Sequence, residues 1–192
     1  ASDPSANVTS QSFTWAVVTT DTAAPTIALT SPTTSSTYSS TSAFLTLTGT
    51  ASDDVGVSTV TWTNSKGGSG TAAGTTSWSV VIPLSPGSNV ITMTARDAAN
   101  KSASVVLTVS ADPGAPTLTI TAPTTAATYS ATSSSLSLGG TASDDVAVTS
   151  ITWTNSRGGS GTATGTTSWS ATVALQTGSN TITVTAQDAA GH

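Results

Sequence analysis

Short runs in which apolar residues alternate with hydroxyl-bearing residues dominate this sequence. Leucines alternate with threonines in FLTLTGTA at 44–51, and Val60 and Trp62 alternate with threonines in VSTVTWT at 57–63. Strict alternation predicts strands with one buried and one hydroxyl-rich face. No segment shows a convincing 3.6-residue period, so the predicted fold is all-β. Further strands are predicted at 26–30, 76–82, 89–95 and 103–110, with a weaker one near 70–73.

Turn-forming residues separate these runs. Pro83, Pro86 and Gly87 mark one turn, and SKGGSG at 65–70 is expected to be a mobile loop, because glycines hold a strand poorly. Short strands with turn signals at this spacing are typical of a β-sandwich.

The sequence contains a tandem duplication. Residues 25–101 align without a gap to residues 116–192 at a constant offset of 91, and 49 of the 77 positions are identical. A period of this length is too long for a solenoid unit, so each copy is expected to be a domain with its own core. We predict repeat one at 21–111 and repeat two at 112–192, with repeat two lacking its last strand.

Residues 1–20 are similar to the end of a repeat rather than to its beginning. Asp3 and Asn7 correspond to Asp97 and Asn100, and alternation of Phe13, Trp15 and Val17 predicts a strand. Two interpretations stay open. Either the sequence is a window of a longer array, or residues 1–20 of one chain supply the strand that repeat two of another chain lacks. Both predict head-to-tail partners that are copies of the same repeat.

Composition and charge narrow the classes of function. Ser and Thr make up about two fifths of the residues, and nine acidic residues against four basic ones give a net charge of −5. Such a surface offers nothing to bind phosphate, so no nucleic-acid partner is expected. No apolar run approaches the roughly 18 residues that span a bilayer, so no membrane insertion is expected. The absence of cysteine excludes disulfides and thiolate metal sites.

Side chains for catalysis are not indicated. His192 is the only histidine, no G-x-S-x-G motif is present, and adjacent residues such as Asp53 and Asp54 usually diverge too far to act as a glycosidase pair. We therefore predict that the protein is not an enzyme. The repeated tryptophans are predicted to pack in the cores rather than to stack on sugars: Trp62, Trp78, Trp153 and Trp169.

Two segments carry a resemblance to a known family, GTASDDVGVSTVTWTN at 49–64 and SNVITMTARDAAN at 88–100. With a Trp on the third strand and the linkers DTAAP and DPGAP, they resemble the bacterial immunoglobulin-like repeats of secreted proteins, such as domain B of glucodextranase and modules of large surface adhesins. The resemblance implies tandem immunoglobulin-like β-sandwiches arranged like beads on a string. It also implies an extracellular location at a bacterial cell surface, either in a structural or adhesive rod, stalk or filament, or in an accessory carbohydrate-binding or spacer module of a secreted glycoside hydrolase.

The acidic residues are all Asp, and they lie only in the loop after the second predicted strand, in the loop before the last strand, and in the linker into each domain. These loops and the domain entry share one end of an immunoglobulin-type sandwich, so the carboxylates are expected to converge. Converging carboxylates repel unless a cation lies among them, and Ca²⁺ takes about six to eight oxygen ligands. The predicted ligands are Asp21, Asp53, Asp54, Asp97 and Asn100 in repeat one, and Asp112, Asp144, Asp145 and Asp188 in repeat two.

Two other interpretations of these residues stay open. Asp and Asn are also ordinary turn residues, whose side chains accept hydrogen bonds from nearby backbone N–H groups. In repeat one, Arg96 and Lys101 are close enough in sequence to neutralise the cluster, whereas repeat two has Gln187 and His192 at those positions.

Asn7 and Asn100 match the N-x-[ST] pattern, which predicts an attached glycan only where the host glycosylates.

Overall fold

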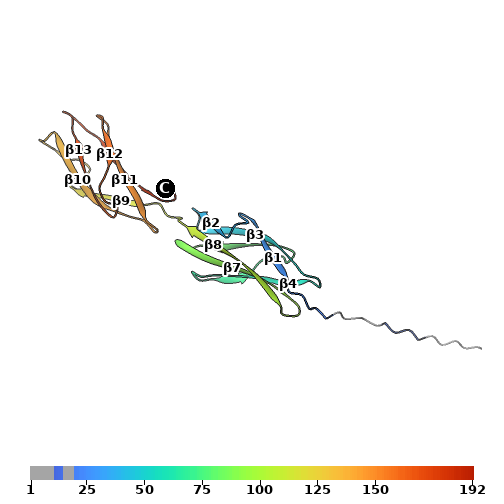
Figure 1. Ribbon diagram of the computed structural model, residues 1–192. Helices are drawn as coiled ribbons and strands as arrows, with labels where there is room; N and C mark the ends of the chain where they lie inside the picture. Colours follow the sequence, from blue (N-terminus) through green and yellow to red (C-terminus); the bar gives the residue numbers. More distant parts are fainter. Residues whose placement is uncertain (1–10, 15–19) are drawn as a thin grey trace, which may run out of the picture.

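Two β-sandwich domains follow one another end to end along the chain (Figure 1). The computed structural model describes residues 11–14 and 20–192, so Asp3, Asn7 and Trp15, and with them most of the segment predicted to be a last or donated strand, lie outside the described residues. No helix in the described part of the chain is long and apolar enough to cross a membrane. The prediction of an all-β fold is confirmed.

Domain one packs a three-stranded sheet, in the order β1-β3-β6, against a five-stranded sheet, in the order β2-β8-β7-β4-β5. All neighbours in these sheets are antiparallel except β2 and β8, which run parallel. The strands are β1 (Thr26–Ser31), β2 (Thr37–Ser40), β3 (Phe44–Ser52), β4 (Val57–Asn64), β5 (Ser69–Thr71), β6 (Ser77–Pro83), β7 (Gly87–Asp97) and β8 (Ser102–Ala111).

Domain two has two three-stranded sheets, in the orders β9-β10-β13 and β12-β11-β14. The second sheet lacks counterparts of β2 and β8, so β14 lies at its edge within the described chain. The strands are β9 (Thr117–Ala122), β10 (Ser135–Ser143), β11 (Val148–Asn155), β12 (Ser160–Thr162), β13 (Ser168–Ala174) and β14 (Ile182–Asp188).

The predicted strands of repeat one correspond to β1, β3, β4, β6, β7 and β8, and the weak one to β5. Two local expectations were wrong. The loop predicted at 65–70 ends at Gly68, and Ser69 and Gly70 pair with β4 instead. The short strand β2 was missed because its sequence, TYSS, has no apolar alternation and forms a strand only beside β8.

The core of domain one confirms the assignment of the alternating side chains. Leu47, Val60, Ile82, Ile91 and Val109 are fully buried between the two sheets. Tryptophan packing is confirmed as well, because Trp78 and Trp169 are 2% and 3% exposed and Trp62 is 8% exposed. Their counterpart Trp153 is half-buried against the smaller core of domain two.

Trp78 on β6 and Trp169 on β13 each lie opposite a glycine of the neighbouring strand. Gly49 pairs with Trp78, and Gly140 pairs with Trp169. A Cβ atom at Gly49 would lie 2.2 Å from Trp78 Cζ2 and 2.2 Å from the carbonyl oxygen of Ala28. The glycine is needed here for space, because the indole ring occupies the volume that a side chain at this position would take.

Candidate cation sites and an open groove

The first aspartate of each Asp-Asp pair shapes a turn. The Asp53 Oδ2 atom accepts hydrogen bonds from the backbone N–H groups of Val55, at 3.1 Å, and Gly56, at 2.9 Å. In the second repeat, Asp144 Oδ2 accepts from Val146 and Ala147, both at 2.9 Å. The hydrogen bond from Gly56 is the main cause that lowers the pKa of Asp53 below its ordinary value. The turn interpretation of these residues therefore holds for one carboxylate oxygen of each.

The second oxygen of these aspartates is not used by the turn. Asp53 Oδ1 and Asp144 Oδ1 are buried and have no hydrogen-bond partner among the described residues. A buried carboxylate oxygen without a partner is unfavourable, because it has lost water without gaining a donor. The turn alone therefore does not account for the Asp-Asp pairs.

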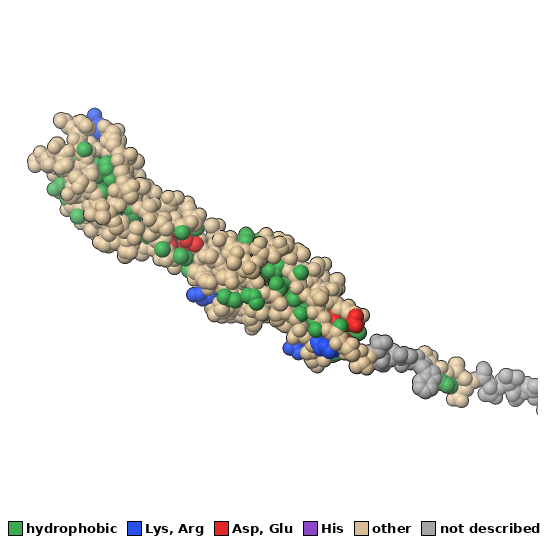
Figure 2. All heavy atoms as spheres, in the orientation of Figure 1, with side chains coloured by type: hydrophobic (Ala, Val, Ile, Leu, Met, Phe, Trp, Pro, Cys, Tyr) green, Lys and Arg blue, Asp and Glu red, His purple; other side chains and the backbone are tan. Residues whose placement is uncertain are grey.

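Acidic side chains gather in two places, at the N-terminal end of domain one and between the two domains (Figure 2). We call Asp21, Asp53 and Asp54 the N-terminal cluster, and Asp112, Asp144 and Asp145 the joint cluster. In each cluster, one carboxylate oxygen from every residue lies within 4.8 Å of the others. The structure thus brings the linker aspartate and the Asp-Asp pair together in both repeats.

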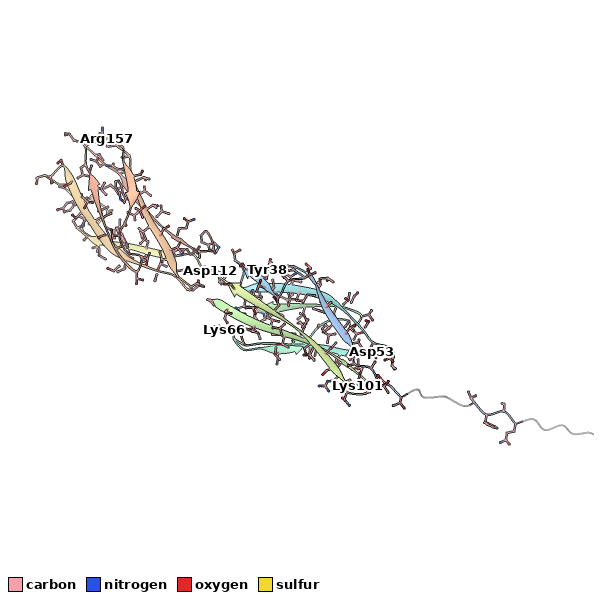
Figure 3. The ribbon with its side chains drawn as sticks, in the orientation of Figure 1. Tyr38, Asp53, Lys66, Lys101, Asp112 and Arg157 are labelled. Carbon is pink, nitrogen blue, oxygen red and sulfur yellow. The ribbon has the colours of Figure 1, made fainter. Side chains whose placement is uncertain are left out.

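A lysine side chain reaches into the N-terminal cluster. The Lys101 Nζ atom donates a hydrogen bond to the backbone carbonyl of Asp21 and lies 3.4 Å from Asp21 Oδ1. Asp53 and Lys101 lie at the same end of domain one (Figure 3). The Lys101 charge also contributes to the lowered pKa of Asp53. Lys101 is 34% exposed and the Asp21 side chain is 9% exposed, so this ion pair is only partly screened by water.

Two predicted ligands of repeat one, Asp97 and Asn100, make hydrogen bonds within the turn between β7 and β8. Asp97 is buried, and its Oδ1 accepts a hydrogen bond from the backbone N–H of Lys101 at 2.9 Å. Asn100 has a positive φ of 69° in the turn after β7, and its backbone carbonyl accepts a hydrogen bond from Arg96 at 3.3 Å. Their function as metal ligands stays a prediction.

In repeat two, Asp188 forms a second group that shares Asp112 with the joint cluster. Oxygen atoms of Asp112 and Asp188 lie within 4.8 Å of each other and of a His192 ring nitrogen. The His192 Nδ1 atom lies 2.9 Å from Asp188 Oδ2, and this hydrogen bond is the main cause that raises the pKa of His192. Burial acts to raise the pKa of Asp188, but hydrogen bonds from His192 and Gly191 hold it below its ordinary value.

Asp112 connects the two domains. Its backbone N–H donates to the carbonyl of Ser40 in domain one, at 2.9 Å, while its carboxylate lies in the joint cluster of domain two. The residue is 9% exposed, and its Oδ1 has no hydrogen-bond partner in the described chain. Burial, together with the carboxylates of Asp188, Asp144 and Asp145, raises the pKa of Asp112. Crowding of negative charge at this position is what a bound cation would relieve.

Domain two also has an open groove between its sheets, with a volume of about 810 Å³. Among its lining residues are Ile120, Tyr129, Leu136, Leu175 and Ile182. In domain one the equivalent space is closed by β8, whose Leu107, Val109 and Ala111 are 1%, 0% and 0% exposed. The groove is the place that a strand like β8 occupies in domain one.

Comparison with known proteins agrees with this architecture. Residues 25–113 match the family model described as glucodextranase, domain B, and residues 116–184 match the bacterial Ig domain. The comparison with curated proteins gave no significant match.

Several solved structures are similar to the chain. They include fibronectin(III)-like modules of Clostridium thermocellum CbhA, at 19% identity, with 85% of this chain and 86% of that chain covered and a TM-score of 0.37. A tetra-tandem repeat from the extending region of a large adhesion protein is 26% identical, with 88% and 46% covered and a TM-score of 0.36. A 1.5-MDa bacterial ice-binding adhesin is 19% identical, with 87% and 60% covered and a TM-score of 0.33. The chain spans less than two thirds of both adhesin structures. Together, the two family matches and the strand order identify the chain as a tandem of immunoglobulin-like β-sandwich domains.

Proposed function

We propose that this chain is a non-catalytic structural or adhesive repeat that forms part of an extracellular rod, stalk or filament at a bacterial cell surface. The observation that carries this proposal is the joint itself. Only residues 112–116 separate β8 from β9, and within them Asp112 contacts domain one through its backbone and domain two through its carboxylate. A short linker with contacts on both sides restricts the angle between domains, which a spacer needs.

The extracellular location is supported by composition and by the family matches. The chain has no cysteine and very few charged residues, and its exposed strand faces are rich in hydroxyl groups. The match of repeat two is to a domain family described as bacterial. A surface of this kind presents many hydrogen-bonding groups and little charge, so it suits an exposed spacer better than a binding site for charged ligands.

The aspartate clusters are proposed to bind Ca²⁺ and stiffen the joints. The donor set fits, because Ca²⁺ prefers carboxylate and carbonyl oxygens in flexible arrangements. Carboxylate oxygens that are buried without a partner among the described residues would gain most from a cation: Asp21 Oδ2, Asp53 Oδ1, Asp97 Oδ2, Asp112 Oδ1 and Asp144 Oδ1. When bound, the ion would supply positive charge and additional oxygen coordination, while the protein residues would hold the linker against domain two.

Calcium binding is tested by thermal unfolding of the purified chain in 10 mM CaCl₂ and in EDTA at equal ionic strength. For a dissociation constant of about 10⁻⁴ to 10⁻³ M, typical of extracellular modules, the native state gains about 1.4 to 2.7 kcal/mol. We expect the midpoint to rise by at least about 5 °C. In the double variant Asp112→Asn, Asp145→Asn, the part of the rise that comes from the joint cluster should disappear. Equal midpoints of the parent chain in both buffers would reject the calcium proposal.

Strand completion is the second part of the proposed assembly. We propose that the groove of domain two takes residues 11–20 of a second chain as its last strand, because Phe13, Trp15 and Val17 alternate as Leu107 and Val109 do in β8. An inserted strand would pair with the free edge of β14 and cover the apolar side chains that line the groove. Repeated insertion would produce a head-to-tail filament.

One observation favours a different function. The match of residues 25–113 to domain B of glucodextranase favours an accessory carbohydrate-binding or spacer module of a secreted glycoside hydrolase. The burial of Trp78 and Trp169 leaves these rings unavailable for sugar stacking. We therefore expect no retention of the chain on insoluble starch or cross-linked dextran in a pull-down, with a known starch-binding module as positive control. Clear retention that soluble glucan competes away would favour the hydrolase module instead.

A further inference from the structure

The two aspartate clusters occupy equivalent positions in the repeat, but the basic side chains near them differ. At the offset of 91, Lys101 corresponds to His192, and Arg96 corresponds to Gln187. The backbone N–H groups of Lys101 and His192 make the same hydrogen bond, to Asp97 Oδ1 and Asp188 Oδ1 respectively, both at 2.9 Å. The two residues therefore start from the same place in the fold and differ only in where their side chains go.

The Lys101 side chain goes into the N-terminal cluster. Its ammonium group contacts the carbonyl and carboxylate oxygens of Asp21, and its charge acts on Asp53. Asp21 Oδ2 and Asp53 Oδ1 have no hydrogen-bond partner among the described residues, but they lie in a cluster that already contains a positive charge. An ammonium group in contact with carbonyl and carboxylate oxygens supplies positive charge next to them, as a bound metal ion would.

The His192 side chain turns instead to Asp188, and no ammonium group enters the joint cluster from its equivalent position. Asp112 Oδ1, on a residue that is nine-tenths buried, is left without a partner in the described chain, as is Asp144 Oδ1. The linker residue Gly114 leaves room for the third carboxylate, because a Cβ atom there would lie 2.7 Å from Asp145 Cγ. The N-terminal linker has Ala23 at this position.

We infer that the joint cluster is the divalent-cation site of this chain, and that the Lys101 ammonium takes the place of the cation in the N-terminal cluster. This inference rests on the calcium binding proposed above and narrows it to one of the two clusters. A metal ion entering the N-terminal cluster must displace Lys101 or accept its repulsion, whereas no lysine ammonium contacts Asp112 among the described residues, and the His192 ring is hydrogen-bonded to Asp188. The residue at the position of Lys101 and His192 thus decides whether a joint depends on metal.

Reciprocal exchange of the two residues tests the inference directly. Calcium binding is measured by titration calorimetry at pH 9 on the parent chain and on Lys101→His and His192→Lys variants. This pH is about 2.5 units above the ordinary pKa of histidine, because the pKa of His192 is raised. We expect one Ca²⁺ per chain for the parent and two for Lys101→His. For His192→Lys, affinity at the joint should fall at least about tenfold, since the new ammonium competes for the same oxygens. The double exchange should restore one site, now in the N-terminal cluster.

Two further variants separate the site from charge and folding effects. Arg157→Gln removes one positive charge, as Lys101→His does at pH 9. Arg157 lies at the far end of domain two, so the Arg157→Gln variant should still bind one Ca²⁺ (Figure 3). Gly114→Ala changes no charge and is expected to weaken binding by displacing Asp145, while Ala23→Gly should leave the parent stoichiometry unchanged. Circular dichroism confirms that each variant is folded.

The outcomes distinguish this inference from the proposal on which it rests. Two Ca²⁺ ions on the parent chain, or one that survives His192→Lys and disappears in Asp21→Asn, would overturn the assignment of the clusters while keeping calcium binding. No Ca²⁺ on the parent chain and none on Lys101→His would overturn both.

Discussion

A chain extended directly after His192 by the ten residues of β8 is expected to unfold at a much higher temperature than the parent chain, with the gain confined to domain two. In domain one, Leu107 and Val109 of this strand are 1% and 0% exposed. Burying two such side chains contributes about 3 to 6 kcal/mol, and β14 would gain an antiparallel partner. Differential scanning calorimetry should show the transition of domain two rising by at least about 10 °C.

A matched extension separates the strand from a general effect of chain length. In the control extension, serine replaces the apolar residues at the positions of Val105, Leu107, Val109 and Ala111, so its length is unchanged but the large side chains of the buried face are gone. Hydrogen exchange should slow at 128–131 and 182–188 in the β8 extension only. Equal stabilisation by both extensions would show that the groove does not select a strand of this pattern.

The same extended chain tests strand exchange between chains. The parent chain should associate with increasing concentration in sedimentation velocity, and the extended chain should stay monomeric because its groove is filled from within. Removal of residues 1–20 from the parent should abolish association as well. A parent chain that stays monomeric at high concentration would reject residues 11–20 as the occupant of the groove.

Replacement of Gly49 by alanine is expected to destabilise domain one by about 3 kcal/mol, as overpacking in a rigid core does. The added Cβ would meet the indole ring of Trp78 on one side and the carbonyl of Ala28 on the other, each at 2.2 Å. Neither can move easily, because Trp78 is 2% exposed and Ala28 belongs to the neighbouring strand. Urea denaturation followed by tryptophan fluorescence gives the free energy of unfolding.

The neighbouring residue supplies the control for this substitution. Thr50 is exposed on the same strand, so Thr50→Ala should change stability by less than about 0.5 kcal/mol. Gly140→Ala should have the corresponding effect on domain two, where the added Cβ would lie 2.0 Å from the carbonyl of Thr119. A Gly49→Ala variant as stable as Thr50→Ala would mean that the strand shifts to admit the methyl group.

Strands with a buried face could be predicted because alternation reports burial directly. A comparison of the two repeats shows which strands alternation does not predict. TYSS at 37–40 is a strand beside β8, whereas TYSA at 128–131 forms no strand where that partner is absent. Likewise β7 begins at Gly87, but β14 begins only at Ile182, four positions later in the repeat. Nearly identical sequences differ here because a tertiary neighbour, not local preference, decides the conformation.

The candidate sites were predictable to a similar extent. The topology of a sandwich is enough to bring Asp21 to the Asp-Asp pair at Asp53 and Asp54, and the structure places them together. The topology is not enough to show that Asp97 is buried or that Lys101 reaches Asp21. Both contacts depend on the side-chain conformations within the turn between β7 and β8. The glycines opposite Trp78 and Trp169 required knowledge of which residues pair across strands, which alternation within one strand does not contain.

The parallel pairing of β2 with β8 has a consequence for a chain under tension. Force on the two ends of domain one pulls β8 toward its C-terminus and the N-terminal strands the opposite way, so the paired residues from Thr37 to Ser40 and from Thr108 to Ala111 slide past each other. Their hydrogen bonds, including those from Thr108 to Ser36 and from Asp112 to Ser40, then bear load together rather than one after another. A domain closed in this way resists extension as a clamp, and domain two acquires the same resistance only once a strand occupies its groove.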